Sequence, residues 1–102
     1  MDDPVYKLLG LCMKAGRLLS GNEQVRESIK SKKGTLLIIA EDCAEKAKKE
    51  YLYLAESASL PVRLFGDKDK LGAAVGKGIR TALLITDHGF GKSIAEKIDD
   101  RK

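Results

Sequence analysis

The chain has 102 residues, of which 43% are hydrophobic and 33% charged, and its net charge is +4. This length suits one core, so we expect residues 1–102 to form a single domain. No apolar run approaches a membrane span, and the acidic start at Asp2 and Asp3 argues against a signal peptide, so we expect a cytoplasmic protein. Cys12 and Cys43 lie in apolar stretches without a CxxC motif, which indicates two buried, reduced thiols.

The first third of the chain predicts two helices joined by a short strand. Aspartate before Pro4 is typical of a helix cap, and glycine or lysine-glycine pairs mark the helix ends. The predicted elements are a helix capped by Asp2 or Asp3 that runs from Pro4 to about Lys14, a brief strand at 17–19, and a helix that begins at Ser20 or Gly21 and ends near Lys33.

The rest of the chain alternates apolar strands with helices. The run Thr35–Ala40 is continuously apolar, which is typical of a strand buried on both faces. Asp42 and Glu45 form a capping-box pattern at the start of the third helix. The further elements are strands at 60–65 and 81–86, and helices at about 42–56, from Asp67 to Gly76, and after Asp87. This order predicts an α/β fold, a three-layer α/β/α sandwich with a small mixed sheet of about four strands.

The stretch Ser20–Arg26, SGNEQVR, is the strongest candidate for a functional site. Val25 and Ile29 are four residues apart, so they occupy the buried face of the helix that starts here. Asn22, Glu23 and Arg26 are then left on the exposed side of its first turn. An amide, a carboxylate and a guanidinium at a helix N-terminus can read base edges and bind phosphate.

Basic residues are concentrated around this stretch. Residues 14–34 carry a net charge of +4, equal to that of the whole chain, so the remaining residues cancel. The basic residues of this segment are Lys14, Arg17, Arg26, Lys30, Lys32 and Lys33. Such a zone favours a polyanionic partner, most simply nucleic acid, although charge alone fits a solvated helix face equally well.

No motif in the sequence predicts catalysis, a metal or a cofactor. Gly89–Ser93 ends like a P-loop, but the first glycine of GxxxxGK[ST] would have to stand at Thr86. Gly72–Lys77 is one residue too short for the same motif and falls at a helix end. His88 is the only histidine, so no histidine-based metal cluster or triad can form unless Cys12 or Cys43 joins it. These absences favour a binding module over an enzyme.

Three segments carry a resemblance to a known family. The second helix opens with Asn22-Glu23 and a basic residue at Arg26, Leu60-Pro61-Val62 precedes a strand, and Leu71–Gly76 reads LGAAVG. In these features, and over nearly its whole length, the chain resembles the ribosomal protein family typified by the archaeal large-subunit protein that binds kink-turn RNA. It is especially similar to the small bacterial members of that family.

The resemblance implies a monomeric sandwich that binds structured, sharply bent RNA containing sheared G·A pairs. Asn22 and Glu23 would read guanine edges, Arg26 would act in place of the family's lysine, and Leu60-Pro61-Val62 would pack on a flipped-out nucleotide. The residues predicted to bind RNA are Ser20, Gly21, Asn22, Glu23, Arg26, Lys14, Arg17, Lys30, Lys32, Lys33, Leu60, Pro61 and Val62. The alternatives are a protein–protein adaptor on the same fold and a nucleotide-binding protein that uses Gly89–Ser93.

The chain departs from the family pattern at three positions. Ser20 replaces a glycine, Gly21 stands where a hydroxyl residue is usual, and Arg26 keeps the charge of the lysine but not its shape. The Asn-Glu pair is unchanged, so the expectation of RNA binding rests on Asn22 and Glu23.

Overall fold

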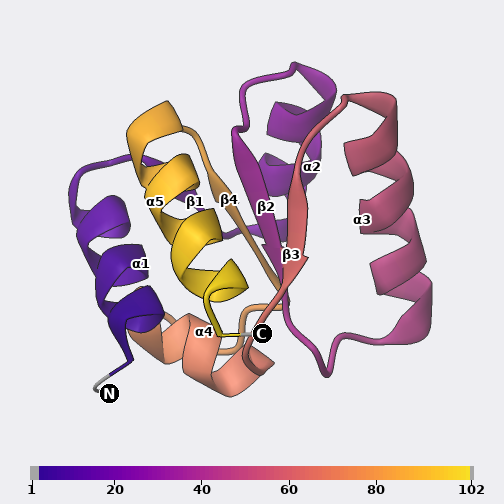
Figure 1. Ribbon diagram of the computed structural model, residues 1–102. Coiled ribbons are helices and arrows are strands. Elements are labelled where there is room, and N and C mark those ends of the chain that lie inside the picture. Colours follow the sequence, from indigo (N-terminus) through magenta and orange to yellow (C-terminus); the bar gives the residue numbers. More distant parts are fainter. Residues whose placement is uncertain (1–2, 102) are drawn as a thin grey trace.

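A computed structural model describes residues 3–101, and it shows three layers (Figure 1). The elements in chain order are α1 (Pro4–Lys14), β1 (Leu18–Leu19), α2 (Asn22–Lys30), β2 (Leu36–Ile39), α3 (Glu45–Ser57), β3 (Val62–Leu64), α4 (Lys68–Ala74), β4 (Ala82–Ile85) and α5 (His88–Asp99). Helices α1 and α5 cover one face of the sheet, α2 and α3 cover the other, and α4 crosses below. The predicted α/β/α sandwich is confirmed.

The sheet is mixed and has the strand order β1-β4-β2-β3. Strand β4 runs antiparallel to both β1 and β2, whereas β2 and β3 are parallel. Every residue of β2 and β4 is buried, as continuous apolar runs predict for strands covered on both faces. The short strands β1 and β3 form the outer edges of the sheet.

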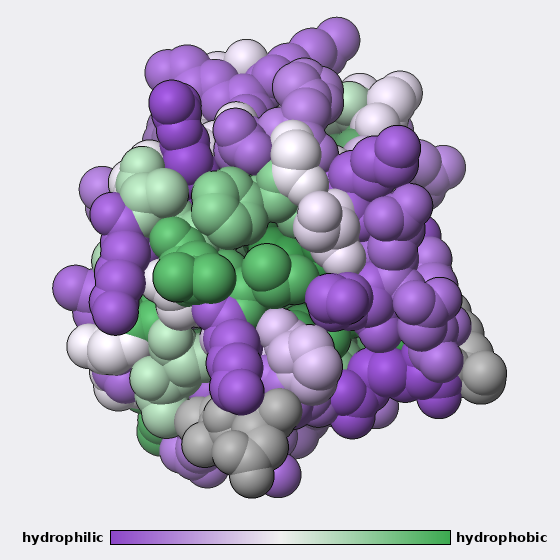
Figure 2. Space-filling model, turned by 60° about the vertical axis from the view of Figure 1, so that its left-hand side comes forward, coloured by the Kyte–Doolittle hydropathy of each residue, from purple (hydrophilic) through white to green (hydrophobic). Residues whose placement is uncertain are grey.

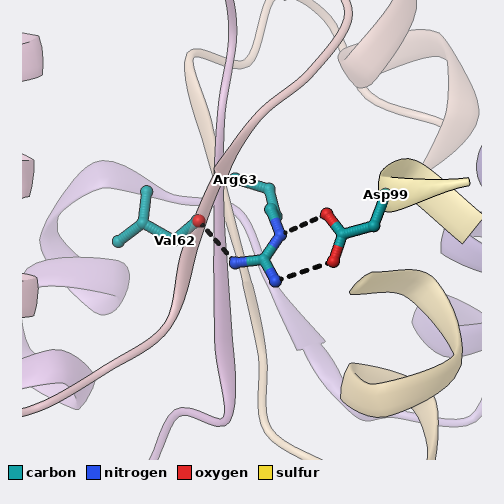
Figure 3. Close-up of polar contacts among 3 residues, drawn as sticks. All are labelled: Val62, Arg63 and Asp99. Carbon is teal, nitrogen blue, oxygen red and sulfur yellow. Dashed lines mark hydrogen bonds and ion pairs between the residues drawn. The ribbon is translucent and has the colours of Figure 1, made fainter. Parts of the chain in front are cut away.

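The two faces of these central strands pack against different layers of helices. In adjacent strands, directly paired residues point to the same side of the sheet. Ile38 pairs with Arg63, whose guanidinium donates to both carboxylate oxygens of Asp99 in α5, at 2.8 and 3.0 Å, and to the Val62 carbonyl (Figure 3). The hydrogen bond to Asp99 raises the pKa of Arg63. Ile38 therefore faces the layer of α1 and α5. Leu84 pairs with Leu37, the neighbour of Ile38 in β2, so Leu84 faces the opposite layer of α2 and α3.

Several boundaries differ from the sequence prediction for local reasons. Helix α2 ends at Lys30 and not near Lys33, because Lys32 has a φ of +57°, outside the helical region. The predicted capping box at Asp42 and Glu45 is wrong. Helix α3 begins at Glu45 without a side-chain cap, and the Asp42 carboxylate accepts instead from the Lys68 N–H at the start of α4, at 2.9 Å.

The first cap and the two thiols agree with the prediction. Asp3 caps α1 by accepting from the Val5 N–H at 2.9 Å, while the alternative cap, Asp2, lies outside the described residues. Cys12 and Cys43 are free and buried. Burial raises the pKa of Cys12 to about 11, so this thiol stays protonated and serves as a small core side chain.

Candidate nucleic-acid interface

Asn22 and Glu23 lie side by side in the first turn of α2, and both are exposed. Strand β1 ends three residues before this turn. Gly21 occupies the N-cap position of α2 and makes no side-chain hydrogen bond to the first turn. Glu23 makes no hydrogen bond or ion pair within the described part of the chain. The structure therefore presents a carboxylate and an amide to solvent at a helix N-terminus, where the helix dipole is positive.

A loop that sequence reasoning missed completes this edge of the molecule. Residues 79–81 follow α4 and, with Ser20, Gly21 and Asn22, line a hollow of about 280 Å³. Ile79 is 59% exposed, so a large aliphatic side chain borders this hollow beside its polar groups. We use the name α2 edge for Gly21, Asn22, Ile79 and Arg80, which line this hollow, together with Glu23, which follows Asn22 in the first turn of α2.

Ser20 lies beneath the α2 edge and helps to hold it in place. It is buried, with 7% of its surface exposed, and its hydroxyl accepts from Arg80 Nε at 3.0 Å. The same guanidinium donates to the Ile79 carbonyl at 2.9 Å. Ser20 therefore holds the loop at 79–81 against the start of α2, and its burial leaves it little surface with which to touch a ligand directly.

Arg26, predicted to lie free on the exposed side, is engaged with α3. Its Nε lies 2.5 Å from Glu50 Oε1, and its guanidinium carbon stands 5.4 Å from the ring centre of Tyr51. Nε is buried and makes no hydrogen bond of acceptable geometry, so Glu50 compensates its charge without satisfying its N–H. Sequence patterning could not show this, because the partners come from another helix.

Apart from Arg26, the residues of the predicted basic zone lie away from the α2 edge, toward the other end of the second helix. Nine residues at a rise of about 1.5 Å each put the end of α2 more than 10 Å from its start. Arg17 and Thr35 flank the carboxyl end of β4, since Thr86 N donates to the Arg17 carbonyl and Thr35 N donates to the Ile85 carbonyl. The predicted residues on this far side are Lys14, Arg17, Lys30, Lys32 and Lys33.

The structure also separates Leu60-Pro61-Val62 from the α2 edge. Val62 begins the outer strand β3, whereas Ser20 leaves the other outer strand, β1, with β4 and β2 between them. Three strand spacings of about 4.8 Å put β1 and β3 roughly 14 Å apart, and Pro61 and Ser20 lie toward opposite ends of these strands. Leu60 is buried, Val62 is half-buried, and Pro61 is exposed.

The alternative of a nucleotide site at Gly89–Ser93 does not fit the structure. A P-loop needs a glycine-rich turn before its helix, but α5 already begins at His88, so these residues are helical. Gly91 packs against β2, since a Cβ at this position would lie 2.6 Å from Thr35 Oγ1. Gly72–Lys77 falls at the end of α4, as predicted.

Within residues 3–101, no group of three or more His, Cys, Asp or Glu side chains is arranged to hold a metal ion. None of the helices described is long and apolar enough to cross a bilayer.

A second surface of interest lies on the other side of the sheet from Asn22. Figure 2 brings the side of α1 forward and shows hydrophobic side chains gathered in the middle of this face, with hydrophilic ones around them. On α1, Leu11 is 55% exposed, and it borders a groove of about 540 Å³ that reaches Ala73 and Ala74 at the end of α4. This groove is where the adaptor alternative would place a protein partner.

The fold and the α2 edge define a small α/β module with an exposed amide and carboxylate at one helix N-terminus. The chain belongs to the ribosomal protein L7Ae/L30e/S12e/Gadd45 family, whose model matches residues 3–95. The predicted resemblance is thereby confirmed. Membership places the chain in a family of ribosomal-type, non-enzymatic proteins, in agreement with the prediction of a binding module.

Relatives in bacteria and plants cover most of the chain. It is 26% identical over 94 residues to the RNA-binding protein YlxQ of Bacillus subtilis, covering 92% of this chain and 94% of that protein. It is 41% identical over 89 residues to the large ribosomal subunit protein eL30 of Euphorbia esula, covering 85% and 80%. A solved structure of a protein of unknown function from Bacillus halodurans C superimposes with a TM-score of 0.91 at 35% identity, covering 96% of this chain and 99% of that one.

Proposed function

We propose that this protein binds kink-turn or related bent RNA with sheared G·A pairs, through the α2 edge. The observation that carries the proposal is the exposed Asn22-Glu23 pair at the N-terminus of α2. Relatives named as an RNA-binding protein and as a large ribosomal subunit protein support RNA as the partner class. The proposal includes a monomeric, cytoplasmic protein that works as part of a ribonucleoprotein.

The chemistry of the pair suits guanine. A carboxylate only accepts hydrogen bonds, and guanine offers its amino and imino groups as donors. The Asn22 amide adds a donor beside this acceptor. The positive end of α2 and the guanidinium of Arg80 favour nearby phosphates, so positioning and base contacts can come from one edge.

Glu23→Ala is expected to weaken binding to a kink-turn RNA by about 1–3 kcal/mol, the range of a base contact. The substitution leaves guanine donors without an acceptor. A nonspecific polyanion binder would instead gain affinity, because the substitution removes a negative charge. The measurement is a fluorescence or calorimetric titration of wild type and variant at one salt concentration.

An unstructured RNA of equal length is the control for this titration. Its binding should be equal or slightly tighter for Glu23→Ala, since only electrostatics contribute there. Kink-turn binding by the variant that equals or exceeds that of wild type would contradict the assignment of Glu23.

The α2 edge also changes which apolar side chain we expect to pack on an unstacked nucleotide. Ile79 is exposed next to Asn22, whereas Pro61 precedes β3, at the opposite edge of the sheet from β1. Ile79→Ala should therefore lower kink-turn affinity about tenfold, the effect of roughly 1–2 kcal/mol of lost apolar contact. Pro61→Ala, the matched control on the far strand, should stay within twofold.

Competition binding with the same RNA distinguishes the two positions. A larger loss for Pro61→Ala than for Ile79→Ala would return the contact to the segment Leu60-Pro61-Val62.

A further inference from the structure

Tyr51 is the buried link between the core and the α2 edge. It lies in the middle of α3 with 1% of its surface exposed, and its hydroxyl donates to Asn22 Oδ1 at 2.8 Å. A buried tyrosine needs a partner for its hydroxyl. Here that partner is not a core carbonyl but the exposed amide at the start of α2.

This hydrogen bond fixes which end of the Asn22 amide meets solvent. The side chain has an accepting oxygen and a donating NH₂ group on the same carbon, so binding one end orients the other. Tyr51 holds the oxygen. Nδ2 makes no hydrogen bond to any residue between 3 and 101, so both its N–H groups can donate outward.

Contacts with Arg26 hold the Tyr51 ring in place, and the surroundings of its hydroxyl keep it protonated, so that it can donate. The Arg26 guanidinium lies over its ring at 5.4 Å, and Arg26 is paired with Glu50 on the same turn of α3 as Tyr51. Burial raises the pKa of Tyr51, with the charge of Arg26 opposing this, so the hydroxyl remains protonated at neutral pH. Arg26 therefore braces the Tyr51 ring from α2.

We propose that Tyr51 is a positioning residue that fixes Asn22 as a hydrogen-bond donor, so that the α2 edge selects an acceptor atom on the RNA next to the donor group met by Glu23. This inference rests on the proposed function. Guanine offers such neighbouring groups, because its O6 acceptor lies directly beside its N1 imino donor on one edge of the base. Without the tyrosine hydroxyl, the amide would have to be ordered during binding, and the affinity would fall.

The test is a double-mutant cycle with Tyr51→Phe and Asn22→Ala, measured by calorimetric titration of a kink-turn RNA. Tyr51→Phe should weaken binding about three- to tenfold in the wild-type background, the effect of ordering one more side chain. In the Asn22→Ala background it should change affinity by less than about twofold. An equal loss in both backgrounds would show a merely structural role and overturn the inference.

The same helix offers a matched control. Tyr53 is 70% exposed, so Tyr53→Phe also removes one hydroxyl from α3 but should leave the affinity unchanged. The Asn22 side-chain NH₂ signals in a ¹⁵N-correlated NMR spectrum give a readout without RNA. They should shift in Tyr51→Phe and not in Tyr53→Phe, and unchanged signals in Tyr51→Phe would overturn the inference.

Asn22→Asp tests the donor role without removing a core group. An aspartate can still accept from Tyr51 but has no N–H to offer, so binding should fall while the melting temperature stays near that of wild type. Wild-type affinity in Asn22→Asp would overturn the donor role. If Asn22→Ala itself binds as wild type, the proposed function fails at this site; if it binds weakly but Tyr51→Phe binds as wild type, only the Tyr51 inference fails.

Discussion

Leu84→Ala and Ile38→Ala are each expected to lower the free energy of unfolding by about 2–5 kcal/mol, the range for large-to-alanine changes in a core. Both side chains are fully buried in the two central strands. They face opposite layers, since Ile38 pairs with Arg63 on the α5 side and Leu84 packs against Gly34 on the α2 side. Each substitution therefore leaves a cavity in a different half of the sandwich.

Urea unfolding followed by circular dichroism measures these losses. Leu11→Ala is the control, because Leu11 is 55% exposed on α1 and its truncation should change stability by no more than about 0.5 kcal/mol. If Ile38→Ala and Leu84→Ala were as mild as this control, the central strands could not be covered on both faces.

The elements could be predicted from the sequence because their signals are local. The apolar runs at 35–40 and 81–86 have no polar position to turn toward water, so strands buried on both faces are their natural outcome. Caps at Asp67 and Asp87 also follow from neighbours a few residues away. The prediction of a capping box at Asp42 is wrong because the carboxylate accepts from the Lys68 N–H, 26 residues further along the chain.

The site could be predicted only in part for the same reason. Asn22 and Glu23 form a contiguous motif on one helix turn, and the structure leaves both exposed as expected. The engagement of Arg26 with Glu50 depends on how α2 packs against α3, which periodicity does not specify. The sequence does contain a local signal for this loop. Ile79 is surrounded by Lys77, Gly78 and Arg80, and this segment has neither the helical nor the strand periodicity that would predict a buried position for Ile79.

Gly72 connects the core to the α2 edge through a close backbone approach. It lies in α4, and a Cβ at this position would stand 1.6 Å from the Gly78 carbonyl oxygen, which belongs to the loop that carries Ile79. The Gly72 carbonyl in turn accepts from the Lys77 N–H at 2.8 Å. The glycine of the LGAAVG segment is therefore required for helix and loop to pack together, and no rotamer change can relieve a clash with backbone.

Gly72→Ala is expected to lower the free energy of unfolding by about 3 kcal/mol, the upper end of the range for overpacking. The opposite sign would follow from helix propensity alone, because alanine is favoured over glycine inside a helix by about 1 kcal/mol. The loop at 79–81 must move as Gly78 is pushed away, so kink-turn affinity should fall together with stability.

Gly78→Ala is the matched control, since a Cβ there meets nothing within 4 Å. It changes the same loop by the same methyl group and should leave the free energy of unfolding within about 0.5 kcal/mol of wild type. Urea unfolding of both variants, followed by an RNA titration at a temperature where both are folded, separates the two effects. A Gly72→Ala protein more stable than wild type would contradict the contact between α4 and the loop, and with it the support that α4 gives to Ile79 and Arg80.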